Sequence, residues 1–181
     1  MMEKLSVGTL SYLLECNFGT GELIWKNRDR LFFGRTDRWR AWNKHFPGKS
    51  ALTAMRNGYR VGAIFNHSYS AHRVIFAMYH GRWPANQVDH INGIRTDNRI
   101  VNLRDATRAE NTRNSARYST NTSGVAGVTW NKRAKKWKAQ IVISGKQSYL
   151  GYFSNLEDAR RARKDAEAEN GYHPNHGREP L

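Results

Sequence analysis

The chain has one cysteine, Cys16, among its 181 residues, and only 15 acidic side chains against 30 lysines and arginines. One cysteine excludes an intramolecular disulfide framework and a four-cysteine zinc site. Cys16 lies in an apolar segment and is interpreted as a small core residue. No apolar run approaches the ~20 residues of a membrane-spanning helix, and the N-terminal segment lacks the apolar core of a signal peptide. We therefore expect a soluble, cytoplasmic protein with no membrane partner.

The shortage of acidic residues leaves a formal net charge of +15 and an isoelectric point near 10.4. The excess is shared, because residues 1–119 hold 19 basic and 9 acidic side chains and residues 120–181 hold 11 and 6. A positive charge spread along the chain favours a polyanionic partner, although ordinary solvated lysine and arginine would give the same totals. A nucleic acid is the expected polyanion. We expect a monomer and no small-molecule cofactor.

The first 50 residues predict one helix, one strand and an irregular segment. Residues 4–16 carry leucines at helical spacing, and residues 23–26 are typical of a short strand. Residues 27–50 are rich in arginine and aromatic residues without a clear period, so they predict a loop insertion. Its side chains either bind phosphate and stack on bases or form a local aromatic cluster with solvated arginines.

The middle of the chain predicts two strands, over residues 59–65 and 69–73, followed by a short helix over residues 74–80 that ends at Gly81. A polar stretch after Ser115, through residue 123, is the best candidate for a linker.

Residues beyond 124 predict a small α+β module. Strands are expected over residues 125–130, 137–143 and 146–153, and the middle one alternates apolar and polar positions. Ser154 and Glu157 have the spacing of a capping box, which predicts the start of an alanine-rich helix.

Four polar residues within a short segment carry the chemistry: Asp89, His90, Asn102 and Asn111. Residues 88–90 predict a strand, and residues 98–103 predict the strand that returns beside it. A capping box at Thr107 and Glu110 then predicts a helix with Asn111 in or just after its first turn. A strand, loop, strand and helix in this order can bring Asp89 and Asn111 together.

Phosphodiester hydrolysis needs a metal ion, a base and a means of orienting that base. Asp89 and Asn111 offer the oxygen ligands that Mg²⁺ or Mn²⁺ prefers, and His90 can take a proton from water near neutral pH. Asn102 can hydrogen-bond either the loop or His90. The alternative is that Asp-His with Asn-Gly is only turn chemistry, since Asn92-Gly93 is a turn signal by itself.

Residues 88–111, VDHINGIRTDNRIVNLRDATRAEN, resemble the HNH endonucleases of the ββα-metal fold, in particular the phage and intron-encoded homing type. Residues 121–173 resemble the AP2-type DNA-binding domain. The resemblance implies that Asp89 and Asn111 are metal ligands, His90 the general base, and Asn102 a brace for the hairpin. Asn111 stands where many members have histidine, which disfavours zinc.

The residues expected to contact DNA are basic and lie near the motif or in the C-terminal module. For the arginines near the motif, the sequence does not distinguish those that contact DNA from those that are only exposed to solvent. Arg73 is either structural or faces a phosphate. The set is Arg73, Arg108, Arg113, Arg133, Lys135, Lys136, Lys138 and Lys146.

The expected fold class is α+β: an HNH core with an N-terminal strand and helix extension and a C-terminal three-stranded antiparallel sheet plus helix. The predicted domains are residues 1–54, 55–118 and 125–181, with a linker over 119–124. The predicted function is metal-dependent cleavage of double-stranded DNA by a site-preferring homing endonuclease, using one Mg²⁺ or Mn²⁺. Alternatives are a non-catalytic DNA-binding regulator and a nonspecific or structure-specific phage nuclease.

Overall fold

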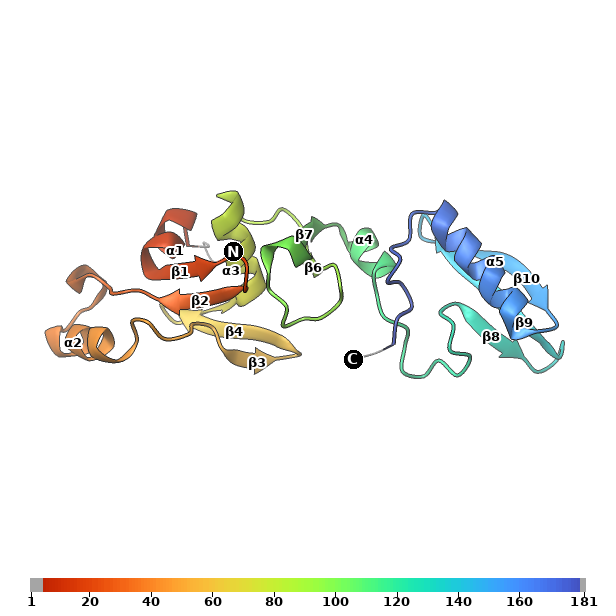
Figure 1. Cartoon of the computed structure of the whole chain (residues 1–181), viewed down its shortest axis with the longest axis horizontal. Coiled ribbons are helices and arrows are strands. Elements are labelled where there is room, and N and C mark those ends of the chain that lie inside the picture. Colours follow the sequence, from red (N-terminus) through yellow and green to blue (C-terminus); the bar gives the residue numbers. More distant parts are fainter. Residues whose placement is uncertain (1–4, 180–181) are drawn as a thin grey trace. The chain divides into compact units, whose positions relative to one another are not determined.

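The computed structural model describes residues 5–179, and the chain divides into two compact units, Met1–Ala106 and Thr107–Leu181. Each unit mixes helices with small antiparallel sheets, so the expected α+β class is confirmed (Figure 1). Residues 1–4, at the start of the chain, and residues 180–181, at the end of the predicted module, lie outside the described residues. None of the helices within residues 5–179 has the length and apolar character that a membrane crossing requires.

The first unit begins with a helix that is shorter than predicted. Helix α1 (Val7–Leu13) gives way to strand β1 (Leu14–Asn17), which pairs antiparallel with β2 (Glu22–Trp25). The prediction of a helix to residue 16 was therefore wrong at its C-terminal end. Leu10, Leu13 and Leu14 are all buried in the core, and the apolar run itself does not mark where the chain changes from helix to strand.

The segment predicted as a loop insertion contains a second helix. After the 3-10 turn η1 (Arg30–Phe32), helix α2 (Thr36–His45) runs for ten residues and buries none of them. Only Trp39, Trp42 and Asn43 are half-buried, so the helix lacks a wide apolar stripe, and this is why the sequence did not predict it. Trp42 packs partly against the core.

A three-stranded sheet and a buried helix complete the core of the first unit. Strands β3 (Ala54–Arg56), β4 (Tyr59–Ile64) and β5 (His67–Ser70) pair antiparallel in that order. Helix α3 (Ala71–His80) starts three residues earlier than predicted, replaces the end of the predicted second strand and buries most of its first two turns. It ends at Gly81 as predicted, since this residue adopts the left-handed conformation with φ 67°.

A short hairpin closes the first unit. Strand β6 (Gln87–His90) pairs antiparallel with β7 (Leu103–Ala106), and a 3-10 turn, η2 (Ile100–Asn102), precedes β7. The returning strand thus begins at Leu103, where the predicted one ended. A loop that forms its own hydrogen bonds, with η2 at its end, fills the interval instead.

The second unit contains the C-terminal sheet and helix. The capping box at Thr107 and Glu110 is confirmed at the start of α4 (Arg108–Arg113). Strands β8 (Val128–Asn131), β9 (Lys136–Ile143) and β10 (Lys146–Phe153) form one antiparallel sheet, with β9 in the centre.

Helix α5 (Leu156–Glu169) packs on this sheet, and Ala159 lies in a core cluster with Val128 and Ala139. Its cap differs from the predicted box: the Asn155 side chain accepts from the Asp158 backbone N–H at 2.8 Å. Asparagine is at least as good as serine at this position, so the true cap is one residue further along than predicted.

We predict that Gly62→Ala destabilises the first unit. A Cβ at Gly62 would lie 2.7 Å from Leu52 Cα, so strand β4 and the buried Leu52 would have to move apart. The expected loss is about 1–3 kcal/mol, as for other overpacked cores. Urea unfolding measures it, with Gly34→Ala as the control because nothing lies within 4 Å of a Cβ there. Equal stability of the two variants would contradict the packing shown here.

Candidate active site

Asp89 and His90 end strand β6 and are both buried, with 7% and 4% of their surface exposed. The antiparallel register sets Asp89 opposite Arg104 and His90 opposite Leu103. Asp89 Oδ2 accepts from both Nε and Nη2 of Arg104, at 3.0 and 2.8 Å. The strand pair therefore fixes the orientation of the Asp89 carboxylate.

The His90 ring is held by Asn98, which the sequence placed only at the start of the returning strand. His90 Nε2 lies 3.0 Å from Asn98 Oδ1, and Asn98 is 1% exposed. Because an amide oxygen only accepts, Nε2 donates, and the lone pair of the neutral ring is on Nδ1. Asn98 lies in a polar loop without periodicity, so no sequence signal distinguishes it from the neighbouring turn residues.

Asn102 contacts the loop and not the histidine. Its Oδ1 accepts from the Asn92 backbone N–H at 2.9 Å, and its Nδ2 donates to the Asp97 carbonyl at 2.8 Å. Asn92 in turn donates from Nδ2 to Asp97 Oδ2 at 2.7 Å. The sequence left open whether Asn102 bonds the loop or His90. In the structure it bonds the loop, as a residue that braces the hairpin would.

Asp97 is a further residue missed by the sequence analysis. Arg99 donates to both Asp97 oxygens at 2.7 Å, and hydrogen bonding from this guanidinium lowers the pKa of Asp97 to about 2. The carboxylate therefore stays charged near neutral pH and keeps its bonds to Arg99 and Asn92. These hydrogen bonds connect residues across the loop between β6 and β7.

Two more rings pack against His90. His72 of α3 lies edge-on to His90 with ring centroids 5.0 Å apart, and Tyr59 of β4 lies 5.0 Å from His72 and 5.8 Å from His90. Burial lowers the pKa of His90, and it lowers that of His72 to about 3. Both imidazoles are therefore neutral near pH 7, which is the form that a base requires.

The two predicted metal ligands, Asp89 and Asn111, are oxygen donors. Within the described range no three side chains of the His, Cys, Asp or Glu type gather closely enough to hold an ion. An oxygen site with one carboxylate, one amide and water is the kind that Mg²⁺ accepts, since it keeps several waters and binds through few protein ligands. Asp89 on β6 fits such a site. Asn111 lies on α4, in the second unit.

The predicted DNA-contacting residues are distributed over both units. Arg73 is only partly exposed and donates to the Asn86 carbonyl at 3.1 Å. Arg108 is exposed on α4, whereas the Arg113 guanidinium lies 5.7 Å from the Tyr172 ring. The C-terminal set lies at the β8–β9 turn or on the strands of the C-terminal sheet: Arg133, Lys135, Lys136, Lys138 and Lys146, of which only Lys138 is half-buried.

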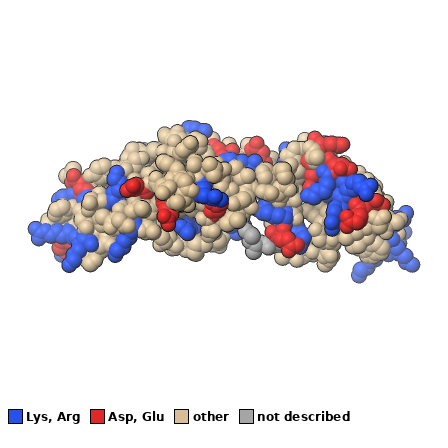
Figure 2. All heavy atoms as spheres, viewed as in Figure 1, with Lys and Arg blue, Asp and Glu red and all other residues tan. Residues whose placement is uncertain are grey.

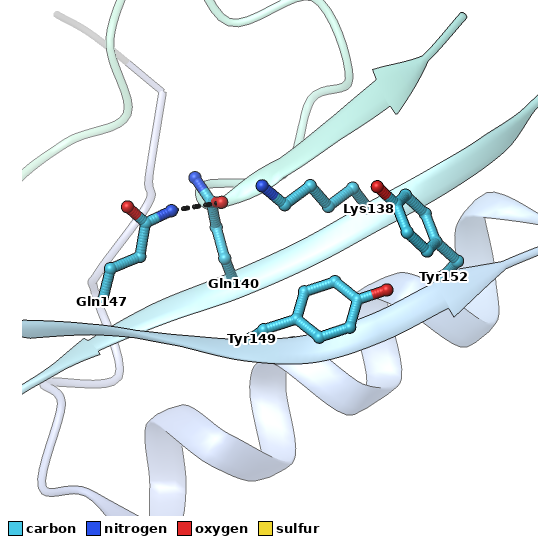
Figure 3. Close-up of a pocket in the computed structure, with 5 residues that line it drawn as sticks. All are labelled: Lys138, Gln140, Gln147, Tyr149 and Tyr152. Atoms are coloured by element: carbon cyan, nitrogen blue, oxygen red, sulfur yellow. Dashed lines mark hydrogen bonds between the residues drawn. The ribbon is translucent and has the colours of Figure 1, made fainter. Parts of the chain in front are cut away.

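Lys138 belongs to a polar surface on the C-terminal sheet. It lies opposite Tyr152, and Gln140 lies opposite Tyr149, while Ala139 between them is buried towards α5. A bulge between Tyr149 and Gly151 changes the alternation, so that Tyr149 and Tyr152 line the same shallow hollow. Figure 3 shows these side chains together, with Gln147 bonded to Gln140. We call this surface the sheet face.

Comparison with known proteins identifies the hairpin region. Residues 69–113 match the HNH endonuclease family. This segment is an HNH endonuclease domain. Over 60 residues the chain is 37% identical to Protein 3.8 of Escherichia phage T7, a match that covers 33% of this chain and 50% of that protein. The chain thus spans about half the length of the curated relative that it matches. No solved structure matches.

We predict that the first unit loses stability in mild acid. A histidine with a pKa near 6.5 when unfolded and about 3 when folded binds a proton only in the unfolded state over that interval. Stability is therefore complete above about pH 6.5 and falls as the pH falls towards 3, by about 2 kcal/mol at pH 5 from His72 alone. Urea unfolding at pH 7.5 and 5 measures the change.

His72→Phe is the matched variant, since it keeps a ring and removes the titrating group. It should flatten the pH dependence without abolishing it, because the pKa of His90 is lowered as well. Identical pH slopes for the two proteins would show that His72 is not buried in its neutral form.

Proposed function

We propose that the protein is a metal-dependent endonuclease that hydrolyses phosphodiester bonds in double-stranded DNA, with the site preference of a homing endonuclease. The observation that carries the proposal is the buried Asp89–His90 pair within the HNH domain, where Asn98 fixes the tautomer of the His90 ring. The net charge of +15 supports DNA as the substrate.

In this proposal Asp89 and Asn111 hold one divalent ion, Mg²⁺ or Mn²⁺. When bound, the ion stabilises negative charge on the scissile phosphate and the leaving oxygen.

His90 acts as the general base. Its Nδ1 accepts a proton from the attacking water, and the Nε2–H bond to Asn98 holds the ring in the required orientation. Asn102 keeps the loop closed through Asn92 and Asp97. His90 thus acts on the attacking water, and Asn102 acts on the backbone of the loop that follows His90.

The sheet face is proposed to read the DNA, in the manner of the AP2-type domain that residues 121–173 resemble. Lys138, Gln140 and Gln147 offer hydrogen-bonding groups, and the exposed Tyr149 and Tyr152 rings offer flat contact surfaces. Basic residues around it hold phosphates, which supplies affinity without sequence information. Binding by such contacts weakens steeply with salt.

We predict that His90→Ala abolishes cleavage and spares DNA binding. Removal of a general base lowers the rate by about 10²–10⁴-fold. Conversion of supercoiled plasmid carrying target DNA, with Mg²⁺ or Mn²⁺, measures cleavage, and fluorescence anisotropy measures binding.

Asp89→Ala should lower activity and change its dependence on metal concentration. Normal cutting by His90→Ala would mean that another group is the base, and a wild-type protein that leaves all plasmids intact with either metal would favour a non-catalytic regulator.

We predict that the sheet face sets the position of cleavage. The triple variant Lys138→Ala, Tyr149→Ala and Tyr152→Ala should still cut but at scattered positions, because the nuclease residues are unchanged. Arg161→Ala, an exposed position on α5, is the control for the loss of one charge. Sequencing of the cleavage ends on genomic DNA measures the effect. Ends that recur at the same sequence in the triple variant would exclude the sheet face as the reader, and wild-type ends without a recurring sequence would favour a nonspecific nuclease.

A further inference from the structure

A buried arginine without an acceptor lies in the first unit, outside the HNH segment. Arg28 is 7% exposed as a residue, and its buried Nε and Nη2 have no hydrogen-bond partner among residues 5–179. The pKa of Arg28 is lowered by burial only to about 10, so the group stays charged near neutral pH. A buried charge without an ion partner is costly, since the low-polarity surroundings replace only part of its hydration.

The surroundings hold this cation firmly in place. The Arg28 backbone N–H donates to Asn43 Oδ1 at 2.9 Å, and its carbonyl accepts from Asn43 Nδ2 and Trp39 Nε1 at 2.8 and 2.9 Å. The guanidinium carbon lies 3.6 Å from the centre of the Trp42 ring and 5.3 Å from that of Phe65. These ring contacts offset part of the cost of burial, but they leave the N–H donors unsatisfied.

The guanidinium lines a hollow of about 520 Å³ between α2, the η1 turn and the end of β4. We call it the Arg28 pocket. Its aromatic walls include Phe33, Phe46 and Phe65, and Arg38 and His45 stand at its edge; no acidic side chain lines it. Trp42, also in the lining, has a buried Nε1 with no acceptor in the described part of the chain. The volume lies within the range of about 300–1,000 Å³ usual for ligand sites.

The charge around the pocket is strongly positive. Helix α2 and the chain leading into it carry many basic side chains, and the nearby acids are occupied, since Asp29 caps η1 and Asp37 pairs with Arg35. Figure 2 shows Lys and Arg atoms gathered at the end of the first unit where Figure 1 places α2. The pocket therefore suits a ligand that has both an anion and a flat ring.

We propose that the Arg28 pocket binds one unpaired nucleotide of the DNA. Its phosphate would accept from Arg38 beside the buried Arg28 charge, and its base would stack on the Phe46 ring, which packs on Trp42 and is 42% exposed. A base within a duplex has both faces covered by its neighbours, so these rings reach a base only where the strand is open. The pocket lies apart from β6 and β7 within the first unit, so it would hold the strand at a distance from the cleavage residues (Figure 1).

The inference rests on the proposed function for the identity of its ligand, but binding in EDTA tests it without cleavage. A single-stranded oligothymidine with one 5-iodouracil is irradiated with the full-length protein, and the cross-linked peptide is identified by mass spectrometry. The iodouracil should label Phe33, Phe46 or Phe65. Absence of a cross-link to these rings overturns the proposal, whatever else is labelled, and such a result leaves the plasmid assay unaffected.

Affinity measurements separate the pocket from general charge. Phe46→Ala and Arg38→Ala should each weaken oligothymidine binding by about tenfold. Arg35→Ala, exposed at the start of the same helix and outside the pocket, should have a smaller effect. An abasic oligonucleotide should bind the wild type more weakly and lose little in Phe46→Ala. Equal losses for Arg35→Ala and Arg38→Ala, or equal binding of the abasic strand, overturn the proposal; circular dichroism checks that each variant is folded.

Discussion

The hydrogen bond between His90 Nε2 and Asn98 Oδ1 is the contact on which the candidate active site depends. It selects the tautomer that leaves Nδ1 basic, and it exists only because the loop from β6 to β7 brings Asn98 back beneath the strand. That loop is closed by Asn102, Asn92 and Asp97, whose bonds involve backbone as well as side chains. Catalytic geometry here is thus a property of the whole turn.

Burial acts on the site in two ways. It lowers the pKa values of His72 and His90, so both rings are neutral where the enzyme is proposed to work, and the His90 ring keeps a lone pair for a proton. The same burial is unfavourable in acid, where the unfolded chain gains protons that the folded site excludes. The buried Asp89 carboxylate is paired with Arg104, which faces it across the hairpin. The burial that keeps His90 neutral for its proposed role therefore also makes the first unit less stable in acid.

Local signals in the sequence predicted the elements whose period or cap is distinct. The strands of the C-terminal sheet, the capped start of α4 and the end of α3 at Gly81 are of this kind. Helix α2 was missed because it buries no residue, and β1 because the leucines of α1 continue into it. In the site, Asp89 and His90 were found by their chemistry. Asn98 was not, since only the folded loop distinguishes it from other polar turn residues.

The basic residues of this chain include exposed lysines and the buried Arg28, and the two kinds suit different contacts. Lys135, Lys136 and Lys146, beside the sheet face, are exposed, and flexible lysine side chains suit contacts that must adapt to a phosphate backbone. The Arg28 backbone is held by Asn43 and its guanidinium by the rings around it, before any ligand arrives. Preorganisation of this kind reduces the entropy lost on binding, which makes a fixed arginine suited to one defined nucleotide. Composition predicts the partner, whereas burial and orientation decide which arginine can be selective.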